Sequence, residues 1–174
     1  MSKQVDKINT QINNLYNSIL LLSRNKLFYT TFDLIDTFQN RIHLVFIHIS
    51  FIFIKSKNSK DHKIYKNFHQ KVFDLIFNNI ETNMREIGYG DTVINKNMKS
   101  LTKTFYNILL DCEKYRSMTK TDKTIFFNKY LKLNDIKNII NNAEIIEYFN
   151  KYEAFCFDLS HDSVLQGELK FNYK

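Results

Sequence analysis

The chain has 174 residues, of which 44% are hydrophobic and 15% aromatic, which is enough apolar material for one folded domain and excludes a disordered segment. Lysine and arginine outnumber aspartate and glutamate by 25 to 18, and the formal net charge of +7 favours anionic partners such as ribosomal RNA or an acidic membrane surface, or simply serves solubility. Cys112 and Cys156 share no metal-type spacing, and the first residues lack the apolar core of a signal peptide, so we expect a protein of the reducing cytoplasm.

Two helices are predicted in the first third of the chain. Apolar residues spaced three and four apart predict an amphipathic helix over residues 4–22, and residues 23–31 are predicted to form a loop. A second helix should follow, with Asp33 or Thr31 as its cap and Ile54 near its end. Its segment 42–54 is apolar on all sides but shorter than the roughly 20 residues that cross a membrane, so we expect it at the centre of a soluble core.

The middle of the chain is predicted to form two long helices. The polar cluster at residues 56–61 is expected to be the most mobile internal loop, and apolar positions four apart then predict a third helix over residues 62–87, ended by Gly88. A fourth helix is predicted to begin between Asp91 and Asn95. One face of it is apolar, with Met98, Leu101, Phe105, Leu109 and Cys112.

Two shorter helices and a tail complete the prediction. Thr121 is expected to cap a fifth helix that continues to Leu131, and Asn134 a sixth that ends near Phe155. Residues 158–174 have irregular spacing and are predicted to form a capping or docking segment. Since no segment shows the two-residue period of a strand, we predict an all-α protein, a single domain over residues 1–174 that forms a bundle of about six helices with a C-terminal extension.

Gly88 and Gly90 are two of only three glycines in a chain that has no proline. About 12 glycines would be usual at this length, so a glycine pair here indicates a requirement of the backbone. We interpret it as a left-handed helix C-terminus and a tight link, with Asp91 at the N-cap of the next helix. A phosphate-binding loop would need a longer glycine motif and a preceding strand, so nucleotide binding is not predicted.

Arg85 and Glu86 precede this corner in the last turn of a helix, where a positive charge suits the helix end and a negative charge does not. Glu86 is therefore expected either to pair with Lys96 or Lys99 or to contact a partner.

The chain contains histidines, cysteines and carboxylates, but their spacing matches no metal-binding or catalytic motif. His43 and His48 lie five residues apart on different helix faces, and no histidine pairs with a cysteine at metal-ligand spacing, so we expect core or interface histidines and neither a metal nor a cofactor. No Ser-His-Asp order, Cys-His pair or carboxylate dyad is recognisable. We therefore predict a protein that is not an enzyme.

Residues 84–106, MREIGYGDTVINKNMKSLTKTFY, resemble the Arg-Glu-x-Gly-Val-Gly-Asp region of the ubiquinol–cytochrome c reductase assembly chaperones of mitochondria and alphaproteobacteria. The matching positions are Arg85, Glu86, Gly88, Gly90, Asp91, Lys96, Met98, Lys99, Phe105 and Tyr106. Weaker likeness is present at Arg41, His43 or His48, Asp74, Phe77, Gly167, Glu168, Leu169 and Phe171. The chain departs from the family pattern where Asn95 replaces a proline and where Asn107 and Ile108 replace a Gly-Arg pair.

The resemblance implies a non-enzymatic chaperone that binds newly made cytochrome b, or its synthesis machinery, and aids biogenesis of the respiratory cytochrome bc complex. It further implies a cytoplasmic location, peripheral contact with the bacterial inner membrane, and the ribosome or a small partner subunit as additional partners. The candidate client or partner contacts are Arg85, Glu86, Tyr89, Asp91, Lys96, Lys99 and Tyr106, with Gly88 and Gly90 as the structural motif.

A function from another class stays open, namely a basic helical module that binds the ribosome or nucleic acid. A continuous basic face without an apolar groove would favour that module, whereas an exposed apolar patch would favour the chaperone.

Overall fold

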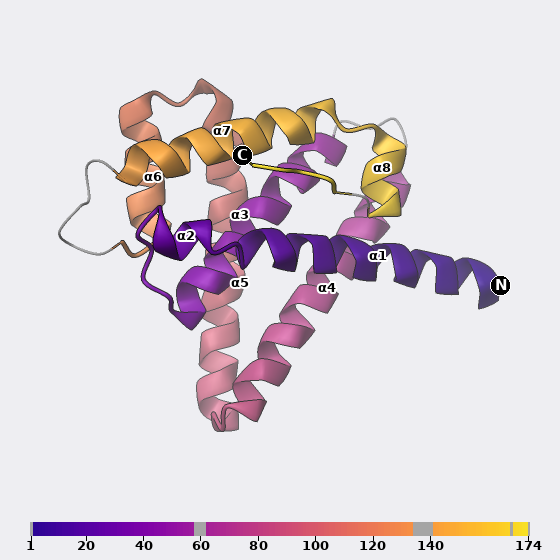
Figure 1. The fold of residues 1–174 in the computed structure, drawn as a ribbon. Coiled ribbons are helices and arrows are strands. Elements are labelled where there is room, and N and C mark those ends of the chain that lie inside the picture. The colour runs from indigo at the N-terminus through magenta and orange to yellow at the C-terminus, as the bar shows by residue number, and fades with distance from the viewer. Residues whose placement is uncertain (1, 58–61, 134–140, 168, 174) are drawn as a thin grey trace.

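The computed structural model describes residues 2–57, 62–133, 141–167 and 169–173 (Figure 1). In these ranges the chain forms helices and no strand beyond one isolated bridge between Leu34 and Leu133, so the predicted all-α class is confirmed. The elements in chain order are α1 (Ser2–Ser23), α2 (Leu27–Thr30), α3 (Phe38–Lys57), α4 (His62–Glu86), α5 (Asp91–Lys114), the 3-10 turn η1 (Tyr115–Ser117), α6 (Lys120–Tyr130), α7 (Asn141–Asp158) and α8 (His161–Gln166).

The central helix is α3. Every residue from Ile42 to Phe53 is buried, because α1, α4, α5, α7 and α8 all pack against this helix. Phe46 and Ile49 have no exposed surface, and His48 and Ser50 are buried among the apolar residues. The segment predicted to occupy the centre of the core does so.

The start of α3 differs from the prediction. Asp33 adopts a left-handed conformation, with φ of +57°, and neither it nor Thr31 caps the helix. Thr37 is the cap, since its hydroxyl oxygen accepts a hydrogen bond from the backbone N–H of Asn40 at 3.1 Å. The preceding loop contains the four-residue helix α2, which buries Phe28 in the core.

The cap of α6 is Thr119 and not Thr121. Thr119 accepts a hydrogen bond from the N–H of Asp122, and the Asp122 carboxylate accepts one from the N–H of Thr119. This reciprocal capping box needs an acceptor side chain three residues after the cap, and Thr124, which stands at that distance from Thr121, has no carboxylate. The predicted cap at Asn134 lies outside the described residues, as does most of the predicted loop, residues 58–61.

The C-terminal tail is partly helical and docks onto the body. Ser160 caps the first turn of α8, and Gly167, whose φ is +72°, follows its last residue. A Cβ atom at Gly167 would lie 2.4 Å from the backbone oxygen of Gln11, so glycine allows α8 to approach α1 closely. Beyond it, Phe171 and Tyr173 contact the ring of Tyr148.

α4 and α5 form a long hairpin. The two helices converge on a turn that projects away from the other helices (Figure 1). Nearer the body, Phe105, Ile108 and Cys112 of α5 are buried against the core, while Met98, Leu101 and Leu109 are partly buried. The hairpin therefore has one end packed in the core and one end, its tip, in solvent.

Candidate functional site

The corner between α4 and α5 has the geometry that its glycines predict. Gly88 has a φ of +95°, and the backbone N–H groups of Gly88 and Tyr89 donate to the carbonyl oxygens of Arg85 and Met84, at 3.0 and 3.1 Å. These two bonds form a Schellman motif, the common left-handed ending of a helix. The predicted left-handed C-terminus is confirmed.

Gly90, and not Asp91, is the N-cap of α5. The backbone of Gly90 is extended, with φ of −75° and ψ of 154°, and Asp91 is the first residue of the helix. The expected cap role of Asp91 is wrong because its carboxylate points to Arg85 instead, with 2.6 Å between Nη1 and Oδ1. Its negative charge still suits the positive end of α5.

Arg85 joins the two sides of the corner. Besides Asp91 it pairs with Glu81, one turn earlier on α4, at 2.8 Å. The hydrogen bonds that it donates to Glu81 and Asp91 raise the pKa of its guanidinium, which stays charged. Because all three side chains are solvent-exposed or nearly so, these pairs add little stability and mainly orient the corner.

Glu86 forms no ion pair with Lys96 or Lys99 in the described part of the chain, so that predicted alternative is wrong. The reason is that the side chain of Glu86 and those of the two lysines lie in different places. Glu86 faces a recess between α1, α3 and α4, whereas the two lysines are exposed on α5 and line no cavity that we identify.

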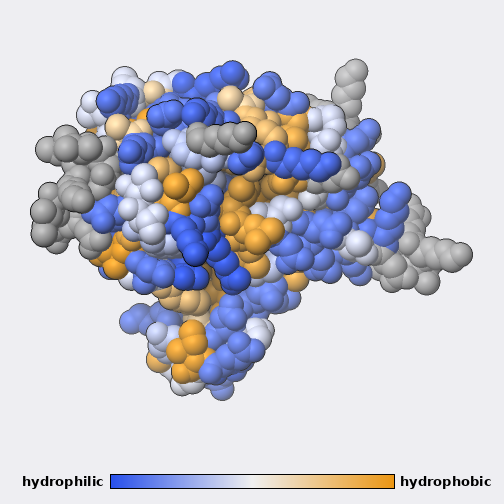
Figure 2. Space-filling model, viewed as in Figure 1, coloured by the Kyte–Doolittle hydropathy of each residue, from blue (hydrophilic) through white to orange (hydrophobic). Residues whose placement is uncertain are grey.

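The seven predicted contact residues are all exposed, but they do not form one site. Arg85, Glu86, Tyr89 and Asp91 lie at the corner, and Lys96 and Lys99 follow along α5. Tyr106 lies 15 residues after Asp91, which corresponds to about 22 Å along a helix. Figure 2 shows apolar atoms among hydrophilic ones at the projecting end of the hairpin.

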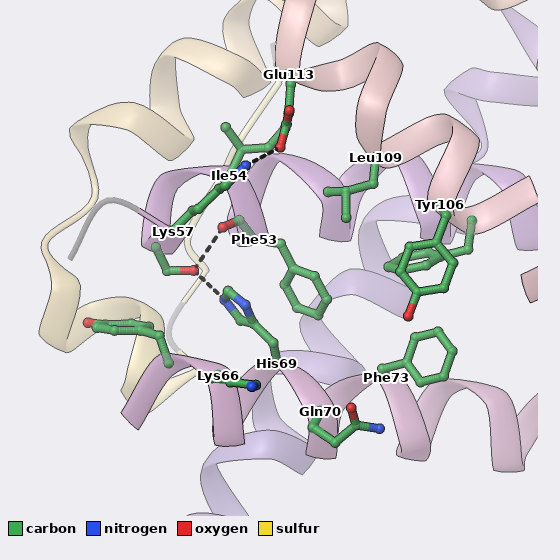
Figure 3. Close-up of a pocket in the computed structure, with 13 residues that line it drawn as sticks. Phe53, Ile54, Lys57, Lys66, His69, Gln70, Phe73, Tyr106, Leu109 and Glu113 are labelled. Atoms are coloured by element: carbon green, nitrogen blue, oxygen red, sulfur yellow. Dashed lines mark hydrogen bonds and ion pairs between the residues drawn. The ribbon is translucent and has the colours of Figure 1, made fainter. Parts of the chain in front are cut away.

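Tyr106 belongs to a second feature, an aromatic groove between α3, α4 and α5 with a volume of about 380 Å³ (Figure 3). Phe73 on α4 stacks on Phe77, with 4.2 Å between ring centroids, and lies 6.1 Å from the ring of Tyr106 on α5. On α3, Phe53 stacks on His69 at 4.2 Å. The groove thus has a floor of aromatic rings contributed by three helices.

Polar side chains border this aromatic groove. His69 shares a hydrogen bond of 2.6 Å with the hydroxyl of Ser56, which fixes its ring against Phe53. Lys57 forms an ion pair with Glu113 at 2.7 Å, linking the end of α3 to α5 (Figure 3). Apolar interior and polar rim together are typical of a surface that binds an apolar segment.

A smaller recess of about 300 Å³ lies on the side of the hairpin that faces α1. Glu86 and Ile87 border it from the corner, Arg24 borders it just after the end of α1, and Phe38 borders it from the start of α3. Glu86 was predictable from the sequence, but neither cavity was, because the residues that line each cavity come from helices far apart in the sequence.

The buried histidines are structural. Nδ1 of His43 lies 2.6 Å from the carbonyl oxygen of Tyr130, while His48 contacts the carbonyl oxygen of Leu44 and the hydroxyl of Tyr148, at 2.6 and 2.9 Å. Burial lowers the pKa of His48 to about 4, so it is neutral near pH 7. Among the described residues, no three His, Cys, Asp or Glu side chains are grouped as metal ligands would be.

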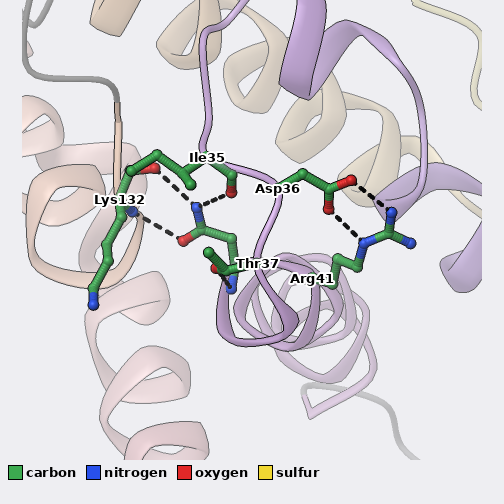
Figure 4. Close-up of polar contacts among 6 residues, drawn as sticks. Ile35, Asp36, Thr37, Arg41 and Lys132 are labelled. Carbon is green, nitrogen blue, oxygen red and sulfur yellow. Dashed lines mark hydrogen bonds and ion pairs between the residues drawn. The ribbon is translucent and has the colours of Figure 1, made fainter.

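Side-chain hydrogen bonds join the start of α3 to the segment after α6 (Figure 4). The Asn40 side chain donates to the carbonyl oxygens of Ile35 and Lys132, at 2.7 and 2.8 Å, and accepts from the N–H of Lys132 at 2.9 Å. Beside it, Arg41 binds Asp36 through two hydrogen bonds. The buried amide of Asn40 is thus fully used for structure.

Within the described residues, every helix is too short or too polar to cross a membrane.

Comparison with known proteins identifies the family. The model of the ubiquinol-cytochrome C chaperone family matches residues 30–171, which is most of the chain. The chain belongs to this family. The match includes the corner and the aromatic groove, but α1 precedes it, so the α1 side of the recess lies outside the matched region.

One solved structure of similar fold is the crystal structure of the Cbp3 homolog from Brucella abortus, with a TM-score of 0.84. The match covers 99% of this chain and 94% of that chain at 18% sequence identity, a level at which the likeness concerns the fold. No curated protein matched the sequence significantly. Membership of the chaperone family therefore rests on the family model, and the fold agrees with it.

Proposed function

We propose that this protein is a non-enzymatic assembly chaperone that binds newly made cytochrome b, or its synthesis machinery, and aids biogenesis of the respiratory cytochrome bc complex. The observation that carries the proposal is the match of the ubiquinol-cytochrome C chaperone model to residues 30–171. The proposed setting is the cytoplasmic side of the inner membrane, with the ribosome or a small partner subunit as further partners.

The aromatic groove supports a chaperone better than a basic module. A membrane-protein client exposes apolar side chains before it is assembled, and a groove floored by Phe53, Phe73 and Tyr106 can shield them from water. Tyr106 in the groove is 52% exposed, and Leu110, one turn later on α5, is 57% exposed. We propose this face as the client contact.

The corner residues complete the proposed partner surface. Arg85, Glu86, Tyr89 and Asp91 lie at the tip, and Lys96 and Lys99 lie between the tip and Tyr106. Partner surfaces usually depend on a few aromatic or arginine anchors, so Tyr106 and Arg85 are the first residues to test.

The test is the amount of bc complex in the native host. A strain without the protein should lose the complex, and Tyr106→Ser should lower it while the protein stays folded and present at its normal level. Ile125→Ser is the matched control, because Ile125 is similarly exposed but lies on α6, outside the groove. Co-purification of cytochrome b with the wild type, and less of it with Tyr106→Ser, would support the client assignment.

Two results would contradict the proposal. Normal levels of the bc complex in the deletion strain would remove the assembly role. If Tyr106→Ser were harmless and lysine-to-glutamine changes on several faces abolished activity in a salt-dependent way, a basic ribosome- or nucleic-acid-binding module would account for the protein instead.

A further inference from the structure

The tip of the α4–α5 hairpin exposes apolar side chains from three consecutive pieces of chain. Ile87 follows the end of α4 and is 64% exposed, Tyr89 in the link is 46% exposed, and Val93 in the first turn of α5 is 45% exposed. The hairpin projects beyond the rest of the molecule, so these side chains can meet a flat surface before the body does (Figures 1 and 2). Isolated exposed apolar residues are ordinary, but three at one projecting tip indicate a contact.

Positive charge follows directly behind the tip. Lys96 and Lys99 are exposed on α5, about 8 and 12 Å from its first residue, and neither has an ion-pair partner in the described residues. Of the two acidic groups nearest the tip, Asp91 pairs with Arg85, and the exposed Glu86 borders the recess on the α1 side of the hairpin. The tip therefore presents an apolar end with a basic zone behind it.

This arrangement fits a lipid surface better than a second copy of the chain or an RNA. A stable dimer buries about 800 Å² on each partner, far more than three side chains provide. RNA would be bound by the lysines and by stacking on Tyr89, which leaves Ile87 and Val93 without a role. Aliphatic side chains that enter the acyl boundary, an aromatic at headgroup depth and lysines toward anionic headgroups are the pattern of interfacial anchors.

We propose that the tip formed by Ile87, Tyr89 and Val93 inserts into the surface of an anionic phospholipid bilayer, with Lys96 and Lys99 attracted to the headgroups. The proposal goes beyond the chaperone function, because it gives Tyr89, Lys96 and Lys99, named above as partner contacts, a lipid partner, whereas the client is assigned to the face of α5 around Tyr106. It places α5 steeply to the membrane plane, with the aromatic groove above the headgroups.

The test uses the fact that the chain contains no tryptophan. Tyr89→Trp places a single fluorescent reporter at the tip, and its emission should shift to shorter wavelength with vesicles of phosphatidylethanolamine and phosphatidylglycerol. Phosphatidylcholine vesicles should cause a much smaller shift. Ile125→Trp, which puts the same reporter on α6, should not shift with either vesicle.

A second set of variants tests which forces act. In the Tyr89→Trp protein, Ile87→Ser combined with Val93→Ser should weaken partitioning into anionic vesicles about tenfold or more, because two apolar side chains no longer enter the acyl boundary. Ile125→Ser is the control and should leave partitioning unchanged. Lys96→Gln combined with Lys99→Gln should also weaken it, and more so at low salt.

Several results would overturn the proposal. An unchanged Tyr89→Trp emission at saturating anionic vesicle concentration is one, and vesicle binding that survives the Ile87 and Val93 changes is another. A shift caused by single-stranded RNA but not by vesicles would assign the tip to nucleic acid. Since vesicle binding is measured on the purified protein, this inference can fail while the effect of Tyr106→Ser on the bc complex stands, and the reverse.

Discussion

At the scale of single residues, the two corner glycines have different reasons to be glycine. A Cβ atom at either position would meet no atom within 4 Å apart from those of its neighbours in the chain, so contact with other residues explains neither glycine. Gly88 has a φ of +95°, whereas Gly90 has a φ of −75° that any residue can adopt. The requirement is therefore one of backbone conformation, and it falls on Gly88 alone.

We expect Gly88→Val to lower the free energy of unfolding by about 1–2 kcal/mol, since a β-branched side chain is penalised at positive φ. Gly90→Ser is the control, because serine suits the extended N-cap position of Gly90, and it should not lower the free energy of unfolding. Urea denaturation followed by circular dichroism measures both. Equal losses in the two variants would show that conformational strain at Gly88 is not the cause.

His48 gives stability a defined pH dependence. Its pKa is about 4 in the folded protein, against about 6.5 in an unfolded chain, so the unfolded chain binds more protons between these values. Its contribution is complete above pH 6.5 and is lost as the pH falls toward 4, by about 3 kcal/mol in total. Urea midpoints measured from pH 4 to 7 should show this slope, and His48→Gln should flatten it. An unchanged slope in that variant would assign the dependence to other groups.

At the scale of helices, the cap of α6 is the point where sequence and structure differ, since the sequence predicted Thr121 and the structure has Thr119. Thr119→Ala removes the side chain that accepts from Asp122 N–H, and we expect a loss of about 1 kcal/mol in the free energy of unfolding. Thr121→Ala, one residue inside the helix, should be nearly neutral. Guanidinium denaturation of the two variants checks the assignment, and the opposite order of effects would favour Thr121 as the cap.

Long helices could be predicted because their apolar residues repeat over several turns, as along α4. α2 could not, since four residues contain only one turn and Phe28 is buried through contacts with α7. The corner was predictable because Arg85, Gly88 and Asp91 are neighbours in the sequence. The aromatic groove was not, since Phe53, His69 and Tyr106 come together only when α3, α4 and α5 pack.

At the scale of the whole molecule, stability depends on the burial of α3. Phe46 is fully buried and contacts Phe77 on α4 and Phe105 on α5, at 5.5 and 5.3 Å between ring centroids. Phe46→Ala should therefore lower the free energy of unfolding by about 3–5 kcal/mol through lost burial and a residual cavity. Differential scanning calorimetry measures this against Ile64→Ala, an exposed α4 control. A loss no larger than that of the control would contradict the central position of α3.

The contacts of His48 with α7 also bear on when the protein can fold during its own synthesis. His48 shares a hydrogen bond with Tyr148, and the backbone oxygen of His48 accepts one from Tyr152, across 100 and 104 residues. Until α7 has left the ribosome, α3 lacks one of its covering helices, and His48 lacks its two hydrogen bonds to α7. Most of the chain must therefore be translated before the core can close. During its synthesis this chaperone thus resembles the membrane proteins that it is proposed to assist. Its most apolar helix, α3, stays partly uncovered until a helix about 100 residues later has been made.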